Sequence, residues 1–102
     1  MITGVFYKGS DLPIILQTDA YLETEGWQGF FIVAKFPDGT VQEYEASIVA
    51  FSSLSATIPK ADNTQAGEIF LQVKAVSGDG PNTTYFGETE SLVIFDPFVV
   101  PP

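Results

Sequence analysis

A turn signal near the middle of the chain constrains the fold more than any other feature. Residues 36–40 read Phe-Pro-Asp-Gly-Thr. Pro37 presets φ for a turn, and the Asp-Gly pair after it tolerates left-handed backbone geometry. The segment before the turn is rich in β-branched and aromatic residues, and the segment after it alternates polar and larger side chains. We therefore predict a β-hairpin with strands near residues 27–36 and 41–50.

Further short strands are predicted on both sides of this hairpin, because no segment shows the 3.6-residue periodicity of a helix. Pro13 lacks a backbone donor, which places its strand at a sheet edge or makes it the start of the strand. The additional strands are predicted at residues 2–8, 12–17, 54–58, 68–76 and 88–95, and Ile69, Leu71, Val73 and Ala75 share one face of the fourth. Seven or eight short strands at roughly ten-residue spacing predict one all-β domain, an antiparallel β-sandwich.

Two of the predicted strands are apolar on both faces. In residues 30–36 one set of alternate side chains is apolar throughout, and the other set still contains Phe31 and Val33; residues 92–95 repeat the pattern. A loop or a neighbouring sheet could cover the second face. Alternatively, that face meets another protein chain, because large exposed apolar patches mark interfaces. Phe31 and Val33 are therefore candidate protein-contact residues, and both explanations stay open.

The last seven residues differ in character from the domain before them. They read Asp-Pro-Phe-Val-Val-Pro-Pro, and the prolines favour an extended or polyproline-like backbone. We divide the chain into a β-sandwich domain at residues 1–95 and an extended apolar C-terminal tail at residues 96–102. Docking of the tail, either on its own sandwich or on a neighbouring subunit, would bury its apolar side chains. Its candidate contact residues are Pro97, Phe98, Val99 and Val100.

The composition argues against several classes of function. The chain carries 13 acidic residues against 4 lysines and no arginine, for a net charge of −9, which repels the phosphate backbone of nucleic acids. It contains neither histidine nor cysteine, so the usual base of hydrolytic catalysis, thiolate metal ligands and disulfides are missing. No apolar run approaches the ~20 residues of a membrane-spanning helix. We expect a protein that is not an enzyme, holds no cofactor and binds neither nucleic acid nor membranes.

The sequence contains three Glu-x-Glu pairs. On a strand, residues i and i+2 share a face, so each pair would place two like charges side by side. A solvated strand face that discourages edge-to-edge aggregation explains them. The alternative is a Ca²⁺ site assembled from two pairs, or from Asp62 and Asp79 in loops. The pairs are Glu23/Glu25, Glu43/Glu45 and Glu88/Glu90.

The aromatic residues offer another binding hypothesis. Trp27 or Tyr85 could stack on a sugar ring, as aromatic side chains do in many carbohydrate-binding β-sandwiches. Such residues also fill cores, with the polar tip at the rim. A carbohydrate- or receptor-binding module is therefore the alternative function.

Three sequence blocks, read together, resemble a known family. They are residues 11–16 (Asp-Leu-Pro-Ile-Ile-Leu), residues 36–46 (Phe-Pro-Asp-Gly-Thr-Val-Gln-Glu-Tyr-Glu-Ala) and residues 65–73 (Gln-Ala-Gly-Glu-Ile-Phe-Leu-Gln-Val). Their order is similar to that in tailed-phage virion structural proteins whose Ig-like β-sandwich carries a Pro-Asp-Gly-Thr hairpin. Related domains occur in baseplate upper proteins and among head and tail proteins. Phe36 stands where the family has Lys, and Tyr44 where it often has Trp.

The resemblance implies an Ig-like antiparallel β-sandwich and a bacteriophage virion protein without catalytic residues. Such a protein acts by protein–protein contacts, as a capsid-decorating (cement) protein or as a connector or baseplate module. The expected partners are other virion proteins, either capsid or tail subunits, and copies of the chain itself. The expected location is the virion, after synthesis in the host cytoplasm.

Overall fold

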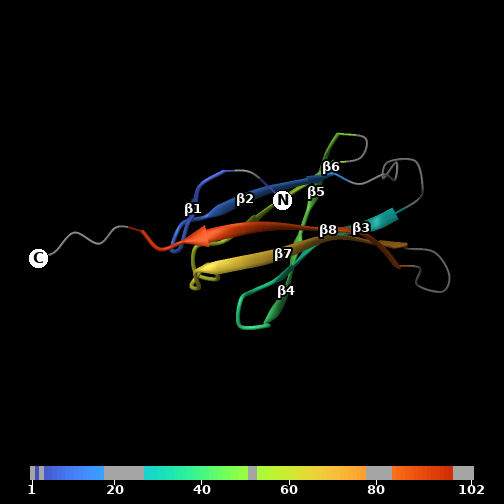
Figure 1. The fold of residues 1–102 in the computed structure, drawn as a ribbon. Helices are drawn as coiled ribbons and strands as arrows, with labels where there is room; N and C mark the ends of the chain where they lie inside the picture. Colours follow the sequence, from blue (N-terminus) through green and yellow to red (C-terminus); the bar gives the residue numbers. More distant parts are fainter. Residues whose placement is uncertain (1, 3, 18–26, 51–52, 78–83, 98–102) are drawn as a thin grey trace, which may run out of the picture.

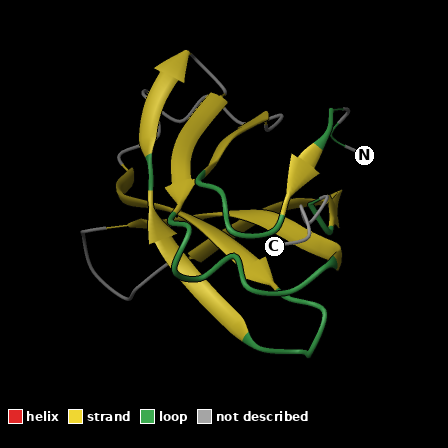
Figure 2. Ribbon diagram, turned by 90° about the vertical axis from the view of Figure 1, so that its left-hand side faces the viewer, coloured by secondary structure: helices red, strands yellow, loops and turns green. Residues whose placement is uncertain are grey.

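The computed structural model of the chain describes residues 2, 4–17, 27–50, 53–77 and 84–97, and these residues form strands and loops without a helix (Figures 1 and 2). The all-β prediction is confirmed. The eight strands are β1 (Phe6–Tyr7), β2 (Leu12–Gln17), β3 (Trp27–Lys35), β4 (Val41–Glu45), β5 (Ser47–Ala50), β6 (Ser53–Ile58), β7 (Gly67–Ser77) and β8 (Thr84–Phe95).

The strands form two sheets. The larger has five strands in the order β1-β8-β7-β3-β4, and the smaller has three in the order β2-β6-β5. Every pair is antiparallel except β1 and β8, which run parallel. The prediction of antiparallel strands throughout is therefore wrong for this pair. β1 and β8 lie at opposite ends of the sequence, so no tight turn forces them into the antiparallel arrangement of a hairpin.

The predicted hairpin is present, and several local contacts fix its turn. The amide of Phe36 donates to the carbonyl of Thr40 over 2.8 Å, and the amide of Gly39 donates to the carbonyl of Phe36 over 2.9 Å. Gly39 has a φ of 90°, in the left-handed region that a side chain disfavours. The Asp38 carboxylate accepts from the amide of Thr40 over 2.9 Å. The turn therefore forms from the residues that predicted it.

Three predicted strands differ from those observed. The strand predicted at residues 88–95 begins earlier, at Thr84, because it pairs with β7 as far as Val76. The single strand expected at residues 41–50 is divided at Ala46 into β4, which pairs with β3, and β5, which pairs with β6 in the other sheet. The strand expected at residues 2–8 is reduced to β1. Gly4 precedes β1 with a φ of 146°, a conformation that side chains rarely adopt and that interrupts a strand.

One hydrophobic core lies between the two sheets. Ile32 and Ala34 of β3, Leu71 of β7 and Leu54 of β6 are fully buried, and each large aliphatic side chain stabilises the fold by about 1.5–3 kcal/mol through burial. The predicted shared face of Ile69, Leu71, Val73 and Ala75 is confirmed, because all four belong to this core. Pro13 lies on β2, an edge strand, as its missing donor predicts.

Candidate protein-contact surface

The side chains of the five-stranded sheet that point away from the core form a surface that we call the outer face. They alternate with core-facing residues along β1, β3, β4, β7 and β8. Its described residues are Tyr7, Phe31, Val33, Lys35, Val41, Glu43, Glu45, Glu68, Phe70, Gln72, Lys74, Val76, Thr89, Ser91, Val93 and Phe95. Apolar and charged side chains are interspersed on it, and Val41 and Phe70 are 55% and 42% exposed.

The two predicted contact residues of β3 lie near the middle of this face. Phe31 is opposite Glu45 on β4 and Lys74 on β7, and Val33 is opposite Glu43 and Gln72 in the same way. Both are half-buried. The three-stranded sheet packs against the opposite side of β3, where Ile32 and Ala34 enter the core, so it does not cover these two side chains. Cover of the doubly apolar strand by the neighbouring sheet is therefore wrong, whereas cover by a loop and contact with another chain stay predictions.

Phe31 is fixed in place by contacts on both sides. The ammonium of Lys74 lies 5.6 Å from the centroid of its ring, a cation–π arrangement, and also forms an ion pair with the Glu43 carboxylate. On the other side, a Cβ at Gly29 would lie only 3.1 Å from the ring edge of Phe31. Glycine at this position therefore lets the aromatic ring lie close to the β3 backbone.

An open depression of about 470 Å³ lies beside Phe70 on the outer face. The side chains that line it are mostly apolar, with Lys35, Gln72 and Thr89 as polar members, so it suits an apolar side chain better than a charged ligand. Gln72 already donates through Nε2 to the carbonyl of Gly87 over 2.8 Å. The lining residues are Val33, Lys35, Val41, Phe70, Leu71, Gln72 and Thr89.

At one end of the molecule, polar side chains bind the backbone of neighbouring loops. We call this region, which contains Asp11, Asn63, Gln65 and the hairpin turn at residues 36–40, the tied end. Its contacts join the three sequence blocks that carry the family resemblance to one another or to adjacent loops. Asp11 Oδ1 accepts from the amide of Lys60 over 2.8 Å, and Gln65 Oε1 accepts from the amide of Asp38 over 2.9 Å. A Cβ at Gly67 would lie 3.1 Å from Pro37 Cγ. These blocks therefore have structural roles in the fold.

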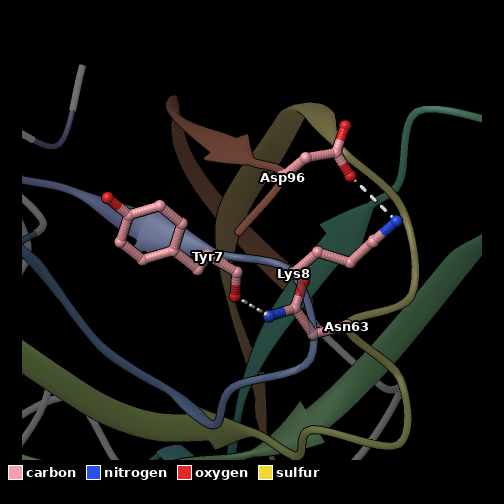
Figure 3. A network of polar contacts seen from close by, with 4 residues as sticks. All are labelled: Tyr7, Lys8, Asn63 and Asp96. Atoms are coloured by element: carbon pink, nitrogen blue, oxygen red, sulfur yellow. Dashed lines mark hydrogen bonds and ion pairs between the residues drawn. The ribbon is translucent and has the colours of Figure 1, made fainter. Parts of the chain in front are cut away.

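Asn63 is the centre of the tied end, and the sequence pattern did not single it out. Its side chain is fully buried. Nδ2 donates to the carbonyl of Tyr7 over 2.9 Å (Figure 3) and to the carbonyl of Ser10 over 2.9 Å. Among the described residues, its Oδ1 has no hydrogen-bond partner. Lys8 forms an ion pair with Asp96 over 2.8 Å nearby. The Asn63 hydrogen bonds hold β1 and the turn after it against the loop that follows β6, and the ion pair joins Lys8 to the end of β8.

Two titratable groups near this end have altered pKa values. Hydrogen bonds from Thr40 hold the pKa of the Asp38 carboxyl below its ordinary value, because they stabilise the charged form. Burial raises the pKa of the Tyr44 hydroxyl, and Asp62, which accepts from that hydroxyl over 2.9 Å, raises it further.

The structure tests only part of the calcium hypothesis. Glu43 and Glu45 share a face as predicted, and Glu43 is paired with Lys74. Among the described residues, no three or more acidic, histidine or cysteine side chains gather in a group that could hold a metal ion. The part of the chain that the structure describes does not include Glu23, Glu25, Asp79 or the side chain of Glu88.

Several other candidate residues are only partly described. Pro97 is exposed, two residues beyond the end of β8, whereas Phe98, Val99 and Val100 lie outside the described residues. Trp27 begins β3 and Tyr85 lies in β8, but the description does not extend to their side chains, so the sugar-stacking hypothesis stays a prediction.

Comparisons with protein-family models, with curated proteins and with solved structures gave no match to this chain. Within the described parts of the chain, no helix has the length and apolar character needed to cross a membrane.

Proposed function

We propose that the chain is a structural component of a tailed-bacteriophage virion and acts by protein–protein contacts. It serves either as a capsid-decorating (cement) protein or as a connector or baseplate module. The observation that carries the proposal is the outer face, where Phe31, Val33 and Phe70 lie on a sheet surface that the other sheet does not cover. Solvent-facing apolar surface of this kind marks protein interfaces.

An Ig-like β-sandwich is part of this proposal, and the strand order supports it. In Ig variable-type sandwiches, strands B, E and D pair in one sheet, and G, F, C and C′ pair in the other. Assigning B, C, C′, D, E, F and G to β2 through β8 in chain order reproduces both sets of neighbours. β1 then adds an edge strand next to G. The arrangement is one that phage structural proteins with the same hairpin would share.

The chemistry of the chain supports a role without catalysis. It has no histidine or cysteine, and the polar side chains of the tied end hydrogen-bond to backbone groups of the fold itself. The partners we propose are capsid or tail subunits and copies of the chain. Many copies that each bury a modest area can still bind a particle firmly through multivalency.

Quantitative mass spectrometry of gradient-purified phage particles from the source of this sequence tests the proposal. We expect the chain in the particles at a fixed ratio to the major capsid protein. Hundreds of copies would indicate the shell, and six or twelve would indicate the tail axis. Absence of the chain from intact particles would overturn the proposal.

Deleting residues 97–102 tests the proposed role of the tail and keeps Asp96 and its ion pair with Lys8. We expect the truncated chain to keep its thermal unfolding midpoint and to occupy fewer sites on particles. Full occupancy by the truncated chain would show that the tail makes no essential contact.

A further inference from the structure

The outer face carries both signs of charge in nearly equal number, although the chain as a whole is strongly acidic. Its described residues include three glutamates and two lysines, which leaves one net negative charge, whereas the whole chain carries −9. Two of the four lysines of the chain, Lys35 and Lys74, therefore lie on this one surface. A surface that is nearly neutral and holds both signs can meet a copy of itself without strong repulsion and with opposite charges in contact.

The outward side of the three-stranded sheet offers a contrast. Its described side chains are uncharged, and four of the seven carry a hydroxyl or amide group, whereas three are aliphatic. They are Pro13, Ile15, Gln17, Ser47, Val49, Ser55 and Thr57. This side has neither the aromatic rings nor the paired charges of the outer face. It provides matched control positions.

The contacts of Phe31 prepare the outer face for binding. The ring lies between Gly29 and the ammonium of Lys74, which also binds Glu43. Side chains that are already ordered lose less conformational entropy when a partner covers them. The depression beside Phe70 adds a space that an apolar side chain of the partner can fill.

Pairing through the edge of the sheet is disfavoured. β4 is an edge strand that pairs only with β3, and Glu43 and Glu45 point to the same side of it. Antiparallel pairing of two β4 edges would bring these glutamates close to those of the second copy. Like charges on neighbouring strands are destabilising and protect sheet edges from such addition.

We propose that two copies of this chain pair face to face through their outer faces, about a two-fold axis. This inference rests on the protein-contact part of the proposed function and names one of the partners. In such a pair the same surface serves both copies. Apolar side chains of each copy enter the depression beside Phe70 of the other, and Lys35 and Lys74 of each face glutamates of the other.

Sedimentation equilibrium of the full chain over a wide concentration range tests the pairing. The critical variant is Phe70→Glu, and Ile15→Glu is its control, because Ile15 is 62% exposed on the three-stranded sheet. We expect a dimer for the unaltered chain, at least about a tenfold higher Kd for Phe70→Glu, and no change for Ile15→Glu. Circular dichroism verifies that both variants are folded. A chain that stays monomeric up to about millimolar concentration, or equal weakening by both variants, would overturn the inference.

Crosslinking locates the contact independently of affinity. Because the chain has no cysteine, Thr89→Cys on the outer face and Thr57→Cys on the three-stranded sheet each introduce a single thiol, and both positions are exposed. A short bis-maleimide reagent should join two copies of the Thr89→Cys variant and leave the Thr57→Cys variant monomeric. Equal crosslinking of the two variants, or crosslinking of Thr57→Cys alone, would place the contact elsewhere.

The salt dependence separates a second copy from a basic partner. Two chains of charge −9 repel at long range, so added NaCl should tighten the pairing by screening that repulsion. The affinity for a basic protein partner should instead fall as NaCl is added. A chain that is monomeric in solution but present in particles would overturn this inference and leave the proposed function standing. A stable dimer that is absent from particles would overturn the proposed function and leave the face-to-face pairing standing.

Discussion

The tied end and the outer face use side chains in opposite ways. At the tied end, Asp11, Asn63 and Gln65 hydrogen-bond to backbone groups of the same chain and fix loops that are distant in sequence. On the outer face, Phe31 and Phe70 lie on the sheet surface without the three-stranded sheet above them. Hydrogen bonds made within the chain stabilise the fold, whereas apolar area left facing solvent can contribute only when a partner covers it.

This difference predicts that the two regions can be altered separately. A substitution at the tied end should lower the free energy of unfolding and leave pairing of the folded chains unchanged. A substitution on the outer face should weaken pairing and leave the free energy of unfolding nearly unchanged, because surface changes away from structural features cost little stability. A change that affected both properties equally would remove the distinction.

The largest effect is expected for Asn63→Ala. The substitution leaves the carbonyls of Tyr7 and Ser10 without their donor in a part-buried setting, which costs about 1–3 kcal/mol. Urea denaturation measures this as a lower midpoint with an unchanged slope. The control is Thr64→Ala at the adjacent exposed position, where we expect little change. A loss below about 0.5 kcal/mol for Asn63→Ala would show that water replaces the amide without cost.

The sequence predicted those parts of the fold that depend on local chemistry. The turn at residues 36–40 follows from Pro37, Asp38 and Gly39 alone, and the buried face of β7 follows from a spacing of two. Residues 41–50 contain no glycine or proline that would mark the division at Ala46. The crossing from one sheet to the other is set by packing and not by local sequence. The parallel pairing of β1 with β8 joins the two ends of the chain, so no local pattern encodes it.

The candidate surface was predicted only in part, from two strands that are apolar on both faces. Phe31 and Val33 were identified because alternate residues of a strand face opposite sides, and both apolar sets were visible in residues 30–36. Lys74 and Phe70 join them through the register of β3 with β7, which a single sequence does not reveal. Asn63 was missed for the same reason, because its partners Tyr7 and Ser10 are 56 and 53 residues away.

A smaller loss of stability is expected for Gly67→Ala at the tied end. Gly67 has a φ of 128°, and an added Cβ would lie 3.1 Å from Pro37 Cγ. Strain and contact together should cost about 1–2 kcal/mol. Gly39→Ala is the matched comparison, because Gly39 also has a positive φ but no neighbouring atom within 4 Å of the added Cβ. The difference in thermal unfolding between the two variants measures the contact with Pro37. Equal losses of stability would show that the cost comes from backbone strain at a positive φ and not from that contact.

On the outer face, Lys74→Met should change stability less. It removes the ion pair with Glu43 and the contact with the Phe31 ring, and partly exposed pairs of this kind contribute about 0.2–1 kcal/mol. Because salt screens such pairs, the difference from the unaltered chain should shrink at high NaCl. Urea denaturation at two salt concentrations measures it. A loss as large as that of Asn63→Ala would mean that the outer face stabilises the fold as strongly as the tied end.

The smallest change at neutral pH is expected for Asp38→Asn, which keeps an oxygen acceptor for the amide of Thr40. Its effect lies in the pH dependence. Hydrogen bonds hold the pKa of Asp38 below the ordinary value of 3.8 in the folded chain, so the unfolded chain binds the proton more readily. The carboxylate therefore stabilises the fold above about pH 4, and this contribution is lost as the pH falls through the lowered pKa.

The measurement is the free energy of unfolding between about pH 2 and pH 6 for both chains. The unaltered chain should lose more stability over this range than Asp38→Asn, and the two curves should approach each other at the acidic end. Glu45→Gln on the outer face is the control for the removal of one carboxylate. Parallel curves for Asp38→Asn and the unaltered chain would show that the turn does not distinguish the charged from the neutral acid. The tied end would then depend on Asn63 and Gln65 and not on charge at the hairpin.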